Sequence, residues 1–250
     1  MAHCAHIPAF VLHQVTCQFA TGQTLFGPLS VSLEPSLCGL VGRNGVGKTR
    51  LLRLLAGLDS PAGGHIERAA AVAWVAQQPT LTPETTLATL LGYASVFAAL
   101  SRLEQGQGLA DDFDLLDGHW DLTDRLSLAF READLPPFSA DRPAFSLSGG
   151  ERMKALLCGA FVSGADYLLL DEPTTHLDRQ GREWLYHQLE SWQGGALIAS
   201  HDRELLTRMP RIIELTPTAL RSYGGNYAEY QRQRMAEQQA ARAALEHAVT

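Results

Sequence analysis

The segment "GRNGVGKT", from Gly42 to Thr49, constrains the fold of this 250-residue chain more than any other. It satisfies the pattern G-x-x-x-x-G-K-[ST] and lies between a short apolar run at 36–42 and a run with helical spacing at 48–58. Glycines in such a loop let backbone N–H groups surround phosphate oxygens, and the N-terminus of the following helix favours anions. The segment therefore predicts a phosphate-binding loop, with Lys48 reaching the β- and γ-phosphates of a nucleotide and Thr49 ligating Mg²⁺.

The composition is that of an ordinary globular protein, with 46% hydrophobic and 19% charged residues. The net charge of -7 argues against a general binder of polyanions. Only two of the 20 basic residues are lysines, Lys48 and Lys154, which makes a lysine inside the glycine-rich loop more informative.

The cysteines and the N-terminus indicate no metal or disulfide framework. The four cysteines are scattered without a CxxC pair, which is typical of reduced thiols in the cytoplasm: Cys4, Cys17, Cys38 and Cys158. His3, Cys4 and His6 lie close together in the sequence, but we interpret them as part of a terminal tail and not as metal ligands.

The sequence contains no secretory signal and no segment long enough to cross a membrane. No basic stretch followed by an apolar core opens the chain. The most apolar window, 87–100, is too short to span a bilayer and contains Thr, Gly and Ser. We therefore expect a cytoplasmic protein without direct membrane insertion.

The order of hydrophobic patterns predicts a parallel α/β core that carries two additions. Two alternating runs within 10–33 predict an antiparallel hairpin, and the apolar run 71–76 predicts a buried strand. Residues 85–145 show helical periodicity, and strand-like and helical runs alternate again after them. This order predicts an inserted helical subdomain at roughly 80–160. Within it, the aspartate-rich stretch 111–124 lacks the ligand spacing of a calcium loop, so we interpret it as solvated helix ends and turns.

The run "YLLLDEP" places two carboxylates at the end of a buried strand. The carboxyl ends of parallel strands form the ligand-binding edge of a sheet. Asp171 is expected to hold Mg²⁺ there, and Glu172, which points elsewhere, to orient or deprotonate the attacking water.

Three other short segments carry residues that are placed, at a helix start or a strand end, where they could contact a bound phosphate. "LSGGE" at 147–151 is a glycine-rich turn that opens a helix. His201 follows a third apolar strand, and Gln77 and Gln78 stand at a strand end just before the helical insertion. Each of these residues alone has an ordinary structural interpretation, and their order and spacing give them weight.

Together these motifs resemble those of an ATP-binding cassette (ABC) ATPase over nearly the whole chain. The resemblance implies the P-loop NTPase fold of that family, with a core α/β domain, an antiparallel β subdomain and an inserted α-helical subdomain. It also implies that an aromatic residue upstream of the P-loop, Phe19, stacks on adenine, although on the sequence alone Phe19 is more simply interpreted as a core residue of the hairpin.

The resemblance further implies that two cassettes close face to face around two ATP molecules. Glu172, His201 and Gln77 are then catalytic, and Thr49, Gln77 and Asp171 are the metal-associated residues, with Gln78 as an alternative to Gln77. One cassette is expected to bind the nucleotide with Phe19, Gly42, Asn44, Gly45, Gly47, Lys48 and Thr49. The other cassette is expected to complete the site across the interface with Ser148, Gly149, Gly150 and the D-loop residue Asp178.

Two segments resemble the ABC-F subfamily in particular. "DEPTTHLD" differs from the usual "DEPTNHLD" of that subfamily only at Thr175, and "YGGNYAEY" is similar to its Y-x-G-N-Y-x-x-Y motif. ABC-F proteins carry two cassettes on one chain, joined by a long helical linker, and resemble translation factors. Residues 226–250 are rich in helix-forming polar residues and are expected to begin such a linker, after a cassette at 1–225. Because the chain stops at Thr250, we expect either an excised N-terminal cassette or a truncated product.

The expected partners are a second cassette, in the same full-length chain or in a homodimer, and the ribosome. The alternative is the cytoplasmic ATP-binding subunit of an ABC transporter, which docks on membrane-spanning subunits. An ATP-gated binding module and a DNA-repair type cassette are further alternatives, and the second is disfavoured because the chain has no room for a long coiled-coil insertion.

Overall fold

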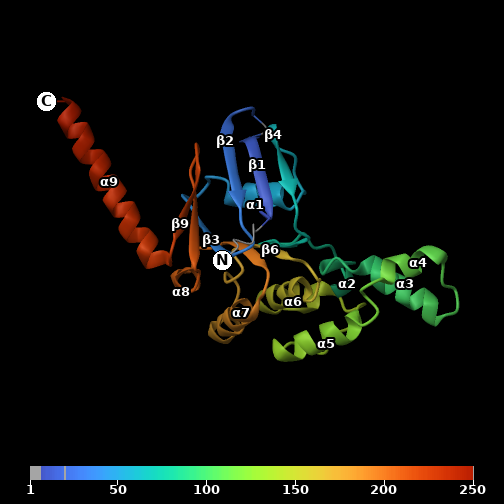
Figure 1. The fold of residues 1–250 in the computed structure, drawn as a ribbon. Coiled ribbons are helices and arrows are strands. Elements are labelled where there is room, and N and C mark those ends of the chain that lie inside the picture. The colour runs from blue at the N-terminus through green and yellow to red at the C-terminus, as the bar shows by residue number, and fades with distance from the viewer. Residues whose placement is uncertain (1–6, 20, 250) are drawn as a thin grey trace, which may run out of the picture. The chain divides into compact units, whose positions relative to one another are not determined.

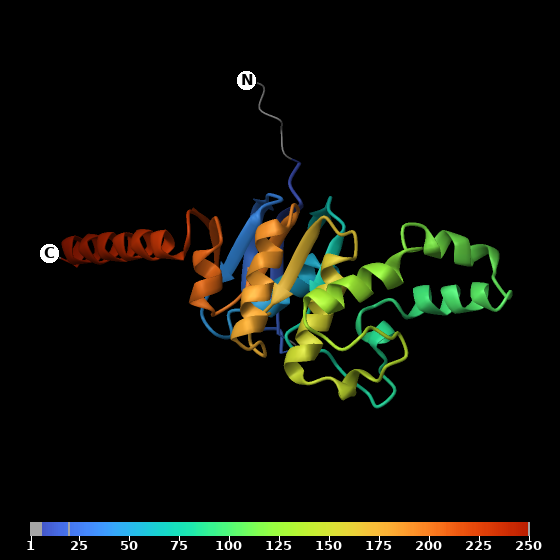
Figure 2. The ribbon, with the colours of Figure 1, turned by 90° about the horizontal axis from the view of Figure 1, so that it is seen from below.

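The computed structural model describes residues 7–19 and 21–249, which form two compact units (Figures 1 and 2). Unit 1 comprises Met1–Val72, Asp166–Glu172 and Trp192–Thr250, and unit 2 comprises Ala73–Ala165 and Pro173–Ser191. The strand β5 (Val72–Val75) begins where the chain passes from unit 1 to unit 2. Among the described residues, no helix is both long and apolar enough to span a membrane.

An antiparallel sheet of unit 1 has the strand order β2-β1-β4. Its strands are β1 (Phe10–Gln18), β2 (Thr24–Leu33) and β4 (Gly63–Arg68). The predicted hairpin is confirmed as β1 and β2, whereas β4 was not anticipated. The sequence of β4, "GGHIER", contains one apolar residue, Ile66, so it has no strand periodicity that could distinguish it from a turn.

A second sheet of unit 1 contains the order β6-β7-β3-β8-β9. Its first four strands are parallel and β9 is antiparallel to β8, with the bounds β6 (Tyr167–Asp171), β7 (Gly195–Ala199), β3 (Leu37–Val41), β8 (Arg211–Leu215) and β9 (Leu220–Gly224). Every residue of β6 and β7 is buried, as expected for central strands of a parallel sheet. The predicted α/β core of the P-loop type is therefore confirmed.

Two helices of unit 1 follow strands of this second sheet. Helix α1 (Lys48–Leu55) buries four leucines, and α8 (Arg203–Thr207) is capped by the side chain of Asp202. The rings of Phe10 in β1 and Tyr167 in β6 form an edge-to-face pair with a centroid distance of 5.0 Å. This aromatic contact joins the cores of the two sheets.

Unit 2 contains the predicted helical subdomain. Its helices are α2 (Leu87–Leu90), α3 (Ala94–Glu104), α4 (Ala110–Leu116), α5 (Leu122–Glu132), α6 (Gly149–Phe161) and α7 (Arg179–Ser191), with a 3₁₀ turn at Ala144–Ser146. Leu122, Leu126 and Phe130 repeat every four residues along α5 and form one buried stripe, as expected for an amphipathic helix. The stripe belongs to the same core as Cys158 of α6.

The aspartate-rich stretch is less solvated than we expected. Asp112 in α4 is only 2% exposed, and its carboxylate accepts hydrogen bonds from the guanidinium of Arg102 and the backbone N–H of Leu109. The arginine and the N–H hold the pKa of Asp112 below its usual range. The interpretation of Asp112 as a solvated residue was wrong because its partner Arg102 lies outside the acidic stretch.

The C-terminal helix α9 (Tyr227–Val249) is anchored on unit 1 by its first turns. Tyr230 is 9% exposed and its ring lies 5.1 Å from that of Tyr223 in β9. Further along α9, Arg234 donates to the buried carboxylate of Glu214 in β8 at 3.0 Å. Glu237 also accepts from the hydroxyl of Tyr223 at 3.1 Å, so the contacts of the described side chains with the sheet lie in the first half of α9, and the end of the helix extends away from the sheet (Figure 1).

Candidate nucleotide-binding site

The glycine-rich loop connects the end of β3 to the first residue of α1 in unit 1. Gly45 and Gly47 adopt positive φ angles of 77° and 106°. At Gly47 a Cβ would lie 2.7 Å from a methyl group of Leu25, so this position requires glycine for both its backbone and its surroundings. Asn44 and Gly45 are exposed at the tip of the loop.

Lys48 is folded back over its own loop. Its Nζ donates to the carbonyl oxygen of Gly42 at 3.1 Å. Burial lowers the pKa of Lys48, while the nearby carboxylates of Glu172 and Asp171 act in the opposite direction. The ammonium group therefore lies at the place where the loop encloses an anion, with one carbonyl as its hydrogen-bond acceptor.

Thr49 and Asp171 join α1 to the end of β6. Thr49 Oγ1 donates to Asp171 Oδ2 at 2.8 Å, and Asp171 is only 3% exposed. Burial raises the pKa of Asp171, whereas the hydroxyl of Thr49 and the charge of Lys48 lower it. A buried carboxylate beside a hydroxyl is a pair of hard oxygen ligands of the type that Mg²⁺ takes from proteins together with substrate phosphates, so these residues fit that ion.

Glu172 leaves the strand in an unusual backbone conformation. Its φ is 48°, in the left-handed region that non-glycine residues occupy at a cost of about 1–3 kcal/mol. The carboxylate accepts from the backbone N–H of His201 at 3.2 Å and lies 3.4 Å from His201 Nε2. Burial raises the pKa of Glu172, and the N–H and imidazole of His201 oppose that rise. The turn in the backbone thus directs Glu172 to His201 while Asp171 faces Thr49.

The "LSGGE" segment forms the N-terminus of α6 in unit 2. Ser148 caps the helix: its side chain accepts from Glu151 N, and Glu151 Oε2 accepts from Ser148 N at 2.7 Å. At Gly150 a Cβ would lie 2.8 Å from the carbonyl oxygen of His176, so a side chain at this position would clash with the backbone. Ser148 itself is exposed, and Gly149 is half-buried.

The remaining expected residues of unit 2 lie near this helix. Gln77 and Gln78 line a hollow of about 290 Å³ together with Gly149 and His176. Asp178 is exposed and its carboxylate accepts from Gly181 N at 2.7 Å, at the start of α7. Gln77 is half-buried and Gln78 is exposed, and both face the same hollow.

Phe19 follows the last residue of β1 in unit 1. Its side chain is 48% exposed, and its backbone N–H donates to Gln23 O across the hairpin turn. The alternative that Phe19 is a core residue of the hairpin is wrong, because its ring is not buried. An exposed aromatic ring at this place is available for stacking.

A second hollow in unit 1 contains residues that the sequence did not single out. It measures about 340 Å³, and its lining includes Gly42 and His201 together with Glu214, Tyr227 and Tyr230. The lone carboxylate in the apolar strand "RIIEL" is the signal that could have drawn attention to Glu214. Through this hollow the edge of the glycine-rich loop and the start of α9 share one space.

The structure groups the expected residues into two sets. Lys48, Thr49, Asp171, Glu172 and His201 come together in unit 1, where the two strand-end carboxylates, the lysine and the threonine are near one another. The glutamines, the "LSGGE" turn and Asp178 belong to unit 2. A parallel sheet with a phosphate-binding loop, a strand-end acid pair and a following histidine defines a P-loop ATPase of the cassette type.

Comparison with known proteins agrees with this class. Residues 27–175 match the family described as "ABC transporter", which covers more than half of the chain. The chain therefore belongs to the ABC ATPase family, as its motifs indicated. Among solved structures, an ATP-binding subunit of an ABC transporter is similar with a TM-score of 0.68 and 21% identity over 90% of this chain and 92% of that one. A dimeric bacterial ABC transporter cassette is similar with a TM-score of 0.63 and 19% identity, over 86% of this chain and 98% of that one. At these identities, the structures support the fold alone.

The more similar sequences are ABC-F proteins, which confirms the likeness to that subfamily. The "energy-dependent translational throttle protein EttA" of Mycobacterium tuberculosis is 34% identical over 90% of this chain and 41% of its own length. EttA of Escherichia coli is 32% identical over 94% of this chain and 47% of its own length. The "probable ATP-binding protein YheS" of the same organism is 34% identical over 81% of this chain and 34% of its own length. The chain thus spans less than half the length of these relatives.

Proposed function

We propose that the chain binds ATP with Mg²⁺ and hydrolyses it at a site built on unit 1. The observation that carries this proposal is the pairing of Thr49 with the buried Asp171, beside Lys48 and next to the Glu172–His201 pair. Together they provide a cation for phosphate, two oxygen ligands for a metal and a carboxylate that can accept a proton.

In this proposal each residue has one task. Lys48 exchanges the carbonyl of Gly42 for phosphate oxygens, and Phe19 stacks on the adenine. Glu172 accepts the proton of the attacking water, and His201, which contacts Glu172, holds the terminal phosphate in place. Thr49 and Asp171 hold Mg²⁺, which when bound neutralises charge on the phosphates.

The residues of unit 2 complete the site of a second cassette. The N-terminus of α6 with Ser148, Gly149 and Gly150 faces the phosphates bound by the partner, and Asp178 lies at the same interface. Unlike these residues, Gln77, or Gln78 as its alternative, is proposed to sense the Mg²⁺ and the attacking water of the nucleotide bound by its own cassette. ATP binding thereby closes two cassettes into a sandwich, and hydrolysis opens it.

We further propose that this is the cassette at 1–225 of a cytoplasmic ABC-F type protein, with its helical insertion at roughly 80–160 and a linker that starts at 226–250. The similarity to EttA, whose name describes a translational throttle, supports a role on the ribosome. The anchored root and the polar remainder of α9 are what a linker between cassettes requires.

Ribosome co-sedimentation tests this role. The Glu172→Gln variant with ATP is trapped in the closed state and is expected to sediment with purified ribosomes, whereas Lys48→Ala with ATP stays in the supernatant. No sedimentation of the Glu172→Gln variant, in the presence of ATP binding measured separately, would contradict the ribosomal role. Recovery of the same variant with membrane-spanning subunits would instead support the transporter alternative.

A further inference from the structure

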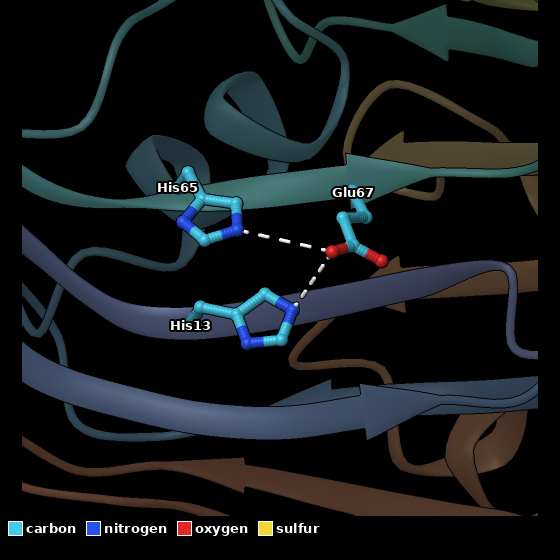
Figure 3. Close-up of side chains that lie close together, drawn as sticks. All are labelled: His13, His65 and Glu67. Atoms are coloured by element: carbon cyan, nitrogen blue, oxygen red, sulfur yellow. Dashed lines mark ion pairs between the residues drawn. The ribbon is translucent and has the colours of Figure 1, made fainter.

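A cluster of two histidines and a glutamate lies on the solvent side of the antiparallel sheet of unit 1, and none of its three residues belongs to the proposed nucleotide site (Figure 3). His13 of β1 is directly opposite His65 of β4 in the strand register, and Glu67 follows two residues after His65 on the same face. Their imidazole and carboxylate ligand atoms all lie within 4.8 Å of one another.

The three side chains present their donor atoms to a common point. The imidazole rings are stacked, with centroids 4.5 Å apart and planes within 15° of parallel. Stacking turns both Nε2 atoms towards one oxygen of Glu67: His13 Nε2 lies 3.2 Å and His65 Nε2 lies 3.8 Å from Oε1 (Figure 3). Donor atoms bound to one tetrahedral zinc ion are separated by about 3.3 Å, given bond lengths of about 2.0 Å, and the present N–O separations are close to that value. Because two nearly parallel rings cannot both direct an in-plane lone pair at one ion, the imidazoles must also rotate out of their stacked arrangement when the ion binds.

The imidazole nitrogen His13 Nε2 makes no well-formed hydrogen bond to the described residues. His13 Nε2 is itself shielded from solvent, although the side chain as a whole is 43% exposed, and its 3.2 Å approach to Glu67 Oε1 does not have the geometry of a hydrogen bond. A metal ion between the three groups would use the lone pair of this nitrogen and the charge of Glu67 together.

We propose that His13, His65 and Glu67 form a binding site for a divalent transition-metal ion of the Zn²⁺ class. Two imidazoles and one carboxylate are a ligand set that zinc takes in proteins, with a further position open to water. Harder ions such as Mg²⁺ prefer oxygen ligands and are selected against. Because the ligands come from β1 and β4, the bound ion fastens these two strands together.

Zinc titration of the untagged chain, followed by calorimetry, tests the site. The titration is done in a background in which His3, Cys4 and His6 are replaced by alanine, because those side chains are themselves zinc ligands. The three cysteines that the structure describes are buried and do not compete. The expected result for the nucleotide-free protein is one Zn²⁺ per chain, with Mg²⁺ at equal concentration leaving the zinc affinity unchanged.

Single substitutions identify the ligands. His13→Ala and His65→Ala are each expected to weaken Zn²⁺ binding at least about 10-fold, and Glu67→Gln to weaken it as well. The matched control is His187→Ala, since His187 also lies beside a carboxylate, 3.7 Å from Glu190, but has no second histidine in that pair. It is expected to leave zinc affinity unchanged.

Thermal unfolding separates loss of the site from loss of the fold. Zn²⁺ is expected to raise the Tm of the background protein by preferential binding to the folded state and to leave the Tm of His13→Ala unchanged. No zinc binding by a folded background protein would overturn the proposal, and so would equal binding by His13→Ala and His65→Ala. ATP binding plays no part in these readouts, so their outcome is independent of the proposed ATPase activity.

Discussion

Lys48 has an internal acceptor that a nucleotide must replace. Its Nζ is bonded to Gly42 O, and burial destabilises its charge. A phosphate offers several anionic oxygens in place of one neutral carbonyl, so the exchange strongly favours binding. Lys48→Ala is therefore expected to weaken ATP binding at least about 100-fold, as measured by calorimetry. Unchanged affinity would contradict the assignment of the loop, and Lys154→Ala, whose lysine bonds Ala133 O in unit 2, is the control.

Glu172 combines backbone strain, burial and a histidine partner. We expect Glu172→Gln to retain ATP binding and to slow hydrolysis about 100-fold or more, because the amide cannot accept the proton of water. Phosphate release and nucleotide binding, measured on the same preparation, check this prediction. Wild-type turnover in the variant would exclude Glu172 as the base.

The pH dependence of hydrolysis follows from the raised pKa of Glu172. The base must be ionised, and burial favours its neutral form. As pH falls, kcat is therefore expected to decline at a pH above the ordinary value of glutamate, about 4.3. A profile of kcat against pH that stays flat down to that value would contradict the prediction.

At the scale of the element, Asp59 fastens the end of α1. Its carboxylate accepts from Arg53 at 2.9 and 2.8 Å and from Arg50 at 3.0 Å, and these bonds, Arg53 first, lower its pKa to about 2. The folded pKa lies below the unfolded one, so the contribution is present above about pH 4 and is lost as pH falls through about 2.

Asp59→Asn is accordingly expected to lower the free energy of unfolding by about 1–2 kcal/mol at pH 7, with the difference from wild type shrinking between about pH 4 and 2. Urea unfolding at several pH values measures it. Asp117→Asn, in an exposed turn, is the control, and a difference that is constant with pH would show that the ion pairs are not its source.

The attachment of the first turns of α9, around Tyr230 and Arg234, to the sheet depends on the buried carboxylate of Glu214. Arg234→Ala leaves Glu214, which is 7% exposed, without its guanidinium, and we expect a loss of about 1–3 kcal/mol in the free energy of unfolding. Arg232→Ala on the same helix is the matched control, since its pair with Glu229 is exposed and worth less than about 0.5 kcal/mol. Equal effects of the two substitutions in urea unfolding would contradict a specific role of the Arg234–Glu214 pair.

The elements that the sequence predicted are those with a strong periodic pattern or a motif. The hairpin, the buried strands and the helical insertion follow from hydrophobic spacing, and the grouping of Thr49 with Asp171 follows from the rule that parallel strands end at one edge. Strand β4 and the burial of Asp112 were not predictable in this way. In both cases a partner distant in sequence, β1 for the strand and Arg102 for the carboxylate, determines the outcome.

For the whole molecule, the division of expected site residues between two units has a kinetic consequence. If Lys48 of one cassette acts with Ser148 of another, the rate of hydrolysis per chain rises with protein concentration. We expect weak, concentration-dependent ATPase activity in phosphate-release assays. A high rate that is independent of concentration would contradict the two-cassette sandwich.

Mixing two inactive variants tests the same arrangement more sharply. Lys48→Ala keeps an intact "LSGGE" turn, and Ser148→Arg keeps an intact glycine-rich loop. In a symmetric pair the mixture contains mixed pairs with one complete site. Activity is therefore expected to reappear on mixing, up to about a quarter of the wild-type rate, and the failure of mixtures to recover any would contradict sharing of the site.

Helix α9 also acts as a lever. The stretch from Tyr230 to Val249 measures about 28 Å at the rise of about 1.5 Å per residue. A tilt of only about 10° at the tyrosine-lined root moves the far end by about 5 Å, a distance comparable to one helical turn. Because Tyr227 and Tyr230 share their hollow with Gly42 and His201, a small displacement of the helix at that hollow would be enlarged at its far end.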